Sequence, residues 1–186
     1  MPTAAPISRV NDFVVRFANV NGSGSASANE MFARAVMRMG VPVAPRNIFP
    51  SNIQGLPTWY EVRISEAGHM GARGGTDLMV AMNPQTFDRD IAGIEPGGYL
   101  FYDSTKPMPP SKFRDDITVI GVPLTAICNR EYADPRQRLM QEPAHPHNSR
   151  EAAGQVFGVL ARELGGFTAQ AEMRRQVVHL MGKLCF

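Results

Sequence analysis

A short stretch near the start of this chain of 186 residues limits most strongly what the chain can fold into. Residues 13–20 form a run rich in β-branched and aromatic side chains, which predicts a strand. A Gly/Ser turn follows and opens directly onto a helical pattern with one apolar face: Met31, Phe32, Ala35, Val36 and Met39. A strand, a tight loop and a helix in this order are typical of α/β folds. They also turn the backbone N–H groups of the first helical turn toward the carboxyl end of the strand.

Two signals mark the ends of this helix. Ser27 and Glu30 have the spacing of a capping box, which predicts that the helix begins at Ser27. Gly40 stands where the glycine that follows a helix is usually found. We therefore expect a helix between these two positions.

The turn between the strand and the helix allows two interpretations. Gly22 and Gly24 supply part of a dinucleotide-binding fingerprint, in which Ser27 stands at the third glycine position. The backbone N–H groups of such a loop can bind a phosphate group; alternatively, the glycines only let the strand and the helix pack closely. On the first interpretation the candidate cofactor-binding residues are Asn21, Gly22, Ser23, Gly24 and Ser25.

Patterns of strands and helices alternate over the following residues. Prolines interrupt residues 41–50, so we expect an edge strand or a shaped loop there. Residues 59–65 alternate between apolar and polar side chains and predict a half-buried strand. The Gly-rich residues 66–76 are typical of the turn of a long hairpin. The apolar run 78–82 predicts a strand that is covered on both faces.

A short helix and two more strands complete the pattern. Asn83 and Pro84 predict the N-cap and the first residue of the helix, and strands are expected at residues 99–102 and 117–120. The fold class is therefore α/β: a three-layer α/β/α domain with a mixed, mostly parallel sheet, in which the hairpin accounts for the mixture.

The character of the sequence changes from about residue 137. Residues 141–148 are polar and broken by prolines, and helical patterns follow over residues 149–164 and 168–184. We expect the domain to occupy residues 10–138, and residues 139–186 to form a linker and a C-terminal helical tail with no assigned role.

Composition excludes several classes of function. A net charge of +2 spread along the chain gives no basic patch, so no nucleic-acid partner is expected. No apolar run approaches the length of a membrane span, and no signal peptide is visible, so we expect no membrane partner and a cytoplasmic location. Cys128 and Cys185 stand alone, whereas an iron–sulfur cluster needs about four thiolates. No complete catalytic set is visible, so we predict neither catalytic residues nor metal ligands.

Three segments together resemble a known family. Residues 19–30, 49–65 and 77–83 resemble, in order and spacing, the gamma domain of 2-oxoacid:ferredoxin oxidoreductases. The resemblance is greatest to the form fused at the N-terminus of the alpha subunit in 2-oxoglutarate-type enzymes, and it spans residues 10–138. It implies a subunit of an enzyme complex.

The resemblance also implies what such a complex does. A 2-oxoacid, here 2-oxoglutarate, is decarboxylated on thiamine diphosphate with Mg, electrons pass through iron–sulfur clusters to ferredoxin, and the acyl group passes to coenzyme A. Alpha- and beta-type subunits would be the partners, with ferredoxin reached through the complex. Because the cofactors sit largely on other domains or chains, this chain alone is expected to bind none of them and to be inactive.

The resemblance places the gamma domain against the thiamine-bearing chains, and the loop before residue 60 is the candidate contact. Its candidate interface residues are Gln54, Trp59 and Tyr60, since exposed aromatic residues are favoured at interfaces. Alternatively, Trp59 packs in the domain's own core. Beyond Arg138 the chain departs from the family pattern. A stand-alone nucleotide- or CoA-binding module, or a truncated non-functional relative, therefore remains an alternative function.

Overall fold

The computed structural model describes residues 4, 5, 7, 9, 11–21, 25–50, 53 and 55–126. The linker and C-terminal helical tail predicted over residues 139–186 lie outside the described residues. In chain order the elements are β1 (Asp12–Val20), α1 (Ser25–Arg38), β2 (Val43–Ile48), β3 (Pro57–Ser65), β4 (Thr76–Ala81), the 3-10 turn Pro84–Thr86, α2 (Phe87–Ala92), β5 (Ile94–Asp103), the 3-10 turn Pro110–Lys112 and β6 (Thr118–Val122).

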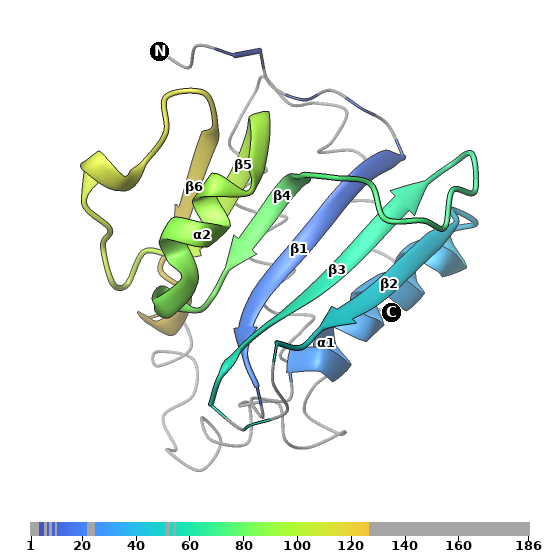
Figure 1. The fold of residues 1–186 in the computed structure, drawn as a ribbon, viewed down its shortest axis with the longest axis horizontal. Coiled ribbons are helices and arrows are strands. Elements are labelled where there is room, and N and C mark those ends of the chain that lie inside the picture. Colours follow the sequence, from blue (N-terminus) through green and yellow to red (C-terminus); the bar gives the residue numbers. More distant parts are fainter. Residues whose placement is uncertain are drawn as a thin grey trace.

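The strands form one six-stranded sheet in the order β2-β3-β1-β4-β5-β6 (Figure 1). The pairs β1–β4, β4–β5 and β5–β6 are parallel, whereas β3 runs antiparallel to both of its neighbours, β1 and β2. The predicted mixed, mostly parallel sheet is therefore confirmed.

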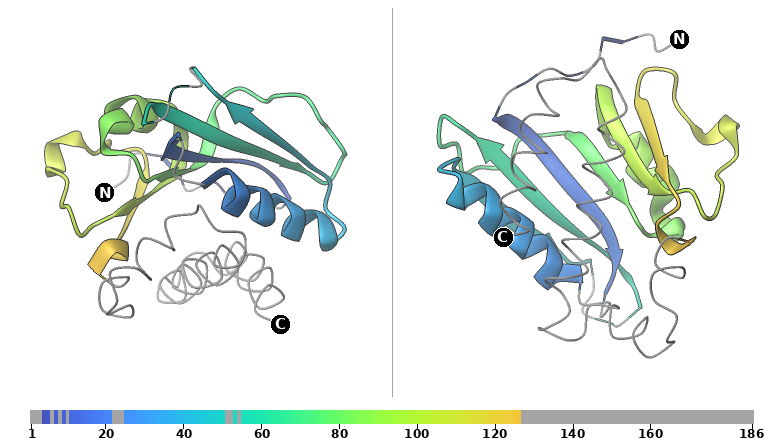
Figure 2. Two further views of the ribbon diagram at one scale, coloured as in Figure 1. Left: turned by 90° about the horizontal axis from the view of Figure 1, so that it is seen from below. Right: turned by 180° about the vertical axis from the view of Figure 1, so that it is seen from behind.

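The helices cover opposite faces of this sheet, which gives the three predicted layers (Figure 2). On one face α1 contributes Phe32 and Val36 to a core cluster, where the ring of Phe32 meets that of Phe17 edge to face at 5.5 Å between centroids. On the other face Ile91 of α2 packs into a second cluster with Trp59 and other sheet residues. No helix in the described part of the chain combines the length and apolar character that crossing a membrane requires.

The predicted hairpin over residues 66–76 is wrong. Strands β3 and β4 do not pair, because β1 lies between them and pairs with both. The Gly-rich segment is instead a crossover past the start of β1. Buried Asp77 helps to hold it there, since its carboxylate accepts a 2.7 Å hydrogen bond from the backbone N–H of Val14.

Strand β3 is buried on both faces rather than half-buried as its alternation predicts. On its polar face, Glu61 is only 3% exposed and stands directly opposite Arg16 of β1 and Arg46 of β2. Both guanidinium groups donate to its carboxylate, at 2.8 Å for Arg46. Two residues further along β3, buried Arg63 forms an ion pair with Asp12 at 2.6 Å. Cross-strand ion pairs thus cover the face that the pattern assigns to solvent.

Helix α1 ends as predicted but begins earlier. Gly40 has φ +86°, the left-handed conformation expected after a helix C-terminus. The helix starts at Ser25, however, so the predicted capping box with Ser27 as N-cap is wrong. Glu30 is exposed and accepts from Arg34 one turn later at 2.7 Å. The predicted cap at Asn83 is confirmed, because its side chain accepts from the N–H of Gln85 at 3.1 Å.

Candidate functional site

A pocket of about 240 Å³ lies where four elements meet. Because β3 runs antiparallel to β1 and β2, its first residues adjoin the carboxyl ends of both strands, and α1 begins beside them. The pocket is lined by Asn19, Val20, Asn21, Ser25, Ala26, Asn29, Asn47, Phe49, Thr58, Trp59 and Tyr60.

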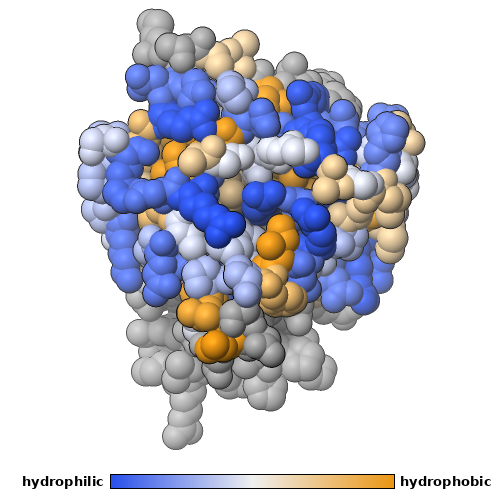
Figure 3. Space-filling view, viewed as in Figure 1, coloured by the Kyte–Doolittle hydropathy of each residue, from blue (hydrophilic) through white to orange (hydrophobic). Residues whose placement is uncertain are grey.

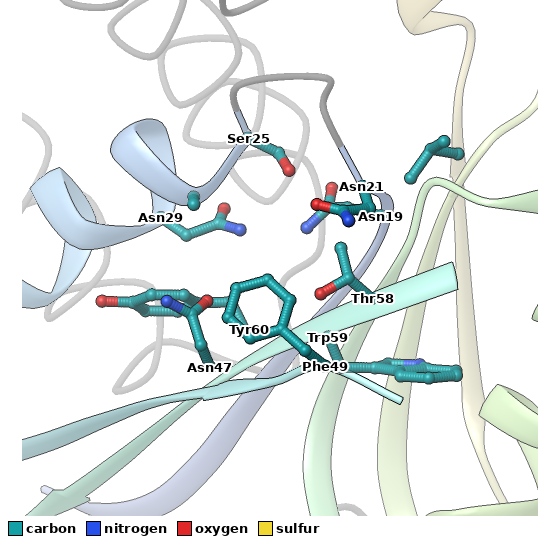
Figure 4. Close-up of a pocket in the computed structure, with 11 residues that line it drawn as sticks. Asn19, Asn21, Ser25, Asn29, Asn47, Phe49, Thr58, Trp59 and Tyr60 are labelled. Carbon is teal, nitrogen blue, oxygen red and sulfur yellow. The ribbon is translucent and has the colours of Figure 1, made fainter. Parts of the chain in front are cut away.

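The pocket has a polar side and an aromatic side (Figure 4). The amide groups of Asn19, Asn21 and Asn29 lie along one side, supplied by the end of β1 and the start of α1. The rings of Phe49 and Tyr60 lie along the other, supplied by the end of β2 and by β3. Among the described residues that line the pocket, none carries a charged side chain.

Hydrogen bonds fix the end of β1 to the turn before β3. The backbone N–H of Asn21 donates to the carbonyl of Leu56 at 2.8 Å, and the N–H of Gly55 donates back to the carbonyl of Asn21 at 2.9 Å. The side-chain amide of Asn21 donates to the carbonyl of Ile53 at 3.0 Å. Gly55 has φ +87°, which suits glycine at this turn. The polar side of the pocket is thus anchored by backbone geometry.

Asn29 differs from the other amides of the pocket. Its side chain is 6% exposed and lies on the face of α1 that carries Phe32 and Val36 into the core. Within the described part of the chain, its Nδ2 has no hydrogen-bond partner. The amide nitrogen points into the pocket in Figure 4. Buried amides are nearly always hydrogen-bonded, so an unpaired one is unusual. This N–H donor is therefore available to a bound group.

Trp59 lies next to Tyr60 in β3, but its ring points to the other face of the sheet, where α2 holds it. The indole N–H of Trp59 donates to buried Asp90 at 2.7 Å, and the hydroxyl of Thr86 donates to the same carboxylate at 2.6 Å. Burial raises the pKa of Asp90, against the opposing effect of these two hydrogen bonds. The guanidinium of Arg89 lies 4.5 Å from the centre of the Trp59 ring. Burial, and secondarily the charge of Glu30, raises the pKa of Tyr60, so its hydroxyl stays neutral.

The structure brings together two sets of predicted residues. Asn21 and Ser25, predicted to bind a cofactor, line the same pocket as Trp59 and Tyr60, predicted to contact a partner. Trp59 and Tyr60 are only 5% and 6% exposed, and Trp59 belongs to a core cluster, as the second interpretation of this residue expects. The remaining candidates, Gly22, Ser23, Gly24 and Gln54, lie outside the described residues.

Sequence reasoning missed the other polar residues of the pocket. Asn19 stands opposite Thr58 in the sheet, and Asn47 stands opposite Tyr60, a register that no local pattern reveals. One signal was available: Asn29 occupies the apolar stripe of α1, three residues before Phe32. Across the described residues, no group of three or more His, Cys, Asp or Glu could hold a metal ion.

Comparison with known proteins relates this architecture to one family. A family model described as pyruvate ferredoxin/flavodoxin oxidoreductase matches residues 14–177. No curated protein matches the chain.

Solved structures of oxidoreductases and their subunits share the fold. The first is 2-oxoglutarate:ferredoxin oxidoreductase from Magnetococcus marinus with 2-oxoglutarate, coenzyme A and succinyl-CoA bound (TM-score 0.59, 21% identity, 95% of this chain and 31% of that one). The second is pyruvate oxidoreductase subunit PORC from Thermotoga maritima (TM-score 0.54, 16% identity, 94% and 96%). The third is the gamma subunit of a keto/oxoacid ferredoxin oxidoreductase from Geobacter sulfurreducens (TM-score 0.55, 17% identity, 92% and 97%). The chain thus spans about a third of the first structure and nearly the whole of the other two.

Proposed function

Since the family model covers residues 14–177, the chain belongs to the pyruvate ferredoxin/flavodoxin oxidoreductase family, and we propose that it acts as the gamma-type component of a 2-oxoacid:ferredoxin oxidoreductase complex. The family predicted from the three motifs is confirmed by this match. The observation that carries the proposal is the match itself. The shared fold of two gamma-type subunits, each covered almost completely, supports it.

The finer statements rest on the resemblance. We propose 2-oxoglutarate as the substrate, supported by the motifs and by the ligand named for the Magnetococcus structure, although the Thermotoga subunit is named for pyruvate. Thiamine diphosphate, Mg and iron–sulfur clusters would reside on alpha- and beta-type partner chains, with ferredoxin as electron acceptor in the cytoplasm. Because no described residues group into a set of metal ligands, no step is assigned to a metal on this chain.

The polar groups that border the pocket are suited to binding part of coenzyme A. The N-terminus of α1 and the side chains of Asn21 and Ser25 border the pocket, where they could bind and orient a part of the cofactor. We retain Gly22, Ser23 and Gly24 as proposed contacts between these two residues. The chemistry that coenzyme A would supply is its thiol, as the acceptor of the acyl group. This chain contributes binding and position.

An apolar edge beside the pocket supports docking to a partner chain. We use this name for Phe49, Ile53, Leu56 and Met82, which follow β2, precede β3 or follow β4 at the same end of the sheet and are 38% to 62% exposed. In Figure 3 hydrophobic residues reach the surface at the lower end of a largely hydrophilic face. Such patches mark interaction sites. With Gln54 in the same loop, this edge is the proposed contact with the thiamine-bearing chains.

Co-purification tests the proposal. The tagged chain, expressed in its native host, is expected to recover chains that carry thiamine diphosphate and iron, identified by mass spectrometry and cofactor analysis. The double variant Phe49→Asp/Leu56→Asp should lose these chains, because it places charges in the apolar edge. Met70→Asp is the matched control, since Met70 is 62% exposed but lies in the crossover at the other end of β3.

Two outcomes would contradict this function. Recovery of no thiamine-dependent chain would favour the alternative, a stand-alone nucleotide- or CoA-binding module, which the neutral pocket beside α1 also supports. Equal recovery of these chains with the double variant would exclude the apolar edge as the contact with them.

A further inference from the structure

One face of the sheet is covered by a helix over only part of its width. On this face α2 packs on β4 and β5 and reaches β3 at Trp59, near the start of that strand. Within the described part of the chain, no helix lies over the rest of β1, β3 and β2 on this side (Figure 1). A three-layer α/β/α domain normally carries helices on both faces of its sheet. The second helical layer is therefore incomplete over these three strands.

Arginines occupy this open part of the sheet. We call the surface the arginine face; its members come from the residues before β1, from β1, β2 and β3, and from the crossover before β4: Arg9, Arg16, Arg46, Arg63 and Arg73. Their ion pairs reach the carboxylates of Asp12, Glu61 and Asp77. Glu61 and Asp77 are nearly fully buried, whereas Arg9 and Arg46 are half exposed, so arginines form the outer surface. In Figure 3 strongly hydrophilic residues cross the middle of this face.

The arginine face has too few acceptors for its donors. Five guanidinium groups share three carboxylates, so these ion pairs leave two positive charges unbalanced. Within the described part of the chain, Nε and Nη1 of Arg63 and Nη1 of Arg73 are buried without a hydrogen-bond partner. A solvated sheet face exposes its polar groups to water, whereas Arg63 and Glu61 are almost fully buried. Because unpaired buried guanidinium groups destabilise a fold, further carboxylates would stabilise this face.

The spacing of the arginines suits the side of a helix. Arg16 and Arg46 stand opposite Glu61 on either side of β3, two strand spacings or about 10 Å apart. Two glutamates seven residues apart on a helix are separated by about the same distance, since each residue adds about 1.5 Å. A helix is also the element that covers the neighbouring part of this face, as α2 does.

The pocket beside Arg63 argues against a ligand of the size of phosphate. This pocket measures about 380 Å³ and is lined by Asp12, Ser65, Glu66, Ala67 and His69. Its two carboxylates would repel an anion. The arginines are distributed instead over three strands and the crossover, an arrangement that fits the extended surface of a protein.

We propose that the arginine face is the docking surface for an acidic helix of a partner chain. Carboxylates along one side of that helix pair with Arg9, Arg16 and Arg46, and the helix completes the second helical layer over β1, β3 and β2. This surface is distinct from the apolar edge, which lies beyond the ends of β2 and β4. That the helix belongs to a chain of the oxidoreductase complex rests on the proposed function, whereas the surface rests on this chain's own residues.

A synthetic helix tests the surface directly. The probe is an alanine-rich peptide of about 20 residues, long enough to form a helix alone, with three glutamates placed seven residues apart. Calorimetric titration of the purified full chain should show binding at low salt that is lost at high salt. A peptide of the same composition, with its glutamates on different sides of the helix, should bind about tenfold more weakly, because it loses at least one charge-assisted hydrogen bond.

A double variant connects this binding to named residues. Arg9→Gln/Arg46→Gln should weaken binding of the first peptide at least about tenfold, because it removes two half-exposed charges from the arginine face. Arg34→Gln/Arg38→Gln is the matched control: it removes the same charge from exposed positions of α1, on the opposite face of the sheet, and should leave binding unchanged. The melting temperatures of both variants check that the fold is retained.

A footprint of the assembled complex requires no variant. Phenylglyoxal, which modifies accessible arginines, should react with Arg9, Arg46 and Arg34 in the purified chain, since all three are at least half exposed. In the complex recovered by co-purification, Arg9 and Arg46 should be protected while Arg34 stays reactive. Mass spectrometry of the digested chain measures the modification at each position.

Contrary results separate this surface from the proposed function. Equal binding of the two peptides, or equal weakening by the two double variants, would mean that net charge alone attracts the peptide and would exclude the surface. Displacement of the peptide by inorganic phosphate at equal ionic strength would indicate a site for small anions instead. Reactive Arg9 and Arg46 in a complex that carries thiamine diphosphate would overturn this inference and leave the proposed function intact. Failure to recover any such complex, with peptide binding as expected, would overturn the function and support the surface.

Discussion

Glu61 receives two arginine side chains from neighbouring strands. Its carboxylate lies almost fully buried between Arg16 and Arg46, in a row that crosses β1, β3 and β2. Arg16 and Arg46 are 25% and 53% exposed, so water can solvate them when the acid is removed. We therefore expect the ion pairs of Glu61 to contribute more to the free energy of unfolding than a surface ion pair does, but less than a fully buried one.

Glu61→Gln should lower the free energy of unfolding by about 2 kcal/mol, because it leaves two guanidinium groups facing a neutral amide. Urea denaturation measures this change. Glu30→Gln is the control, since the exposed Glu30–Arg34 pair should contribute no more than about 0.5 kcal/mol. Equal effects of the two substitutions would mean that burial does not strengthen the ion pairs between Glu61 and the two arginines.

The raised pKa of Asp90 predicts that the stability of the fold depends on pH. Burial raises its pKa above the ordinary 3.8, so the folded chain binds this proton more tightly than the unfolded chain does. The stabilisation is complete below the unfolded-state pKa and is lost as the pH rises through the folded-state pKa. Asp90→Asn should therefore gain stability relative to the native chain as the pH is raised from acid to neutral, measured by urea denaturation at several pH values. A difference that is constant with pH would contradict this assignment.

At the scale of elements, the C-terminus of α1 depends on one backbone conformation. Gly40→Ala should cost about 1 kcal/mol, because an L side chain resists the left-handed region. A Cβ there would meet nothing within 4 Å, so the loss is conformational alone. Gly71→Ala is the control, since Gly71 also has open space but no positive φ. Thermal unfolding should separate the two variants; equal melting temperatures would show that the end of α1 tolerates strain.

The sequence predicts elements well where the signal is local. Pro45 correctly marks β2 as an edge strand, and Asn83 and Gly40 mark real helix ends. The prediction of a hairpin failed because strand pairing is not local. The stretch after β3 has the composition of a turn, but β1 lies beside β3 in the position that β4 would take in a hairpin. The pocket could not be predicted from the sequence for the same reason, since Asn19 and Thr58 meet only through the register of β1 and β3.

At the scale of the whole molecule, the proposed function predicts that the chain is inactive alone. The purified protein should be colourless and should not turn over 2-oxoglutarate or pyruvate, because the redox cofactors are proposed to reside on partner chains. Visible absorption and 2-oxoacid-dependent dye reduction measure this. Brown protein, or turnover without partners, would contradict the assignment, and addition of the co-purified chains provides the positive control.

The place of β1 in the sheet also bears on how the protein folds. This strand is the first of the six in chain order, yet it lies inside the sheet, and its partners among the described strands are β3 and β4, between residues 57 and 81. As the chain leaves the ribosome, β1 therefore has no partner strand until those residues emerge. Pairing over such sequence separations slows folding, so the apolar residues of β1 stay open to chaperones during this interval.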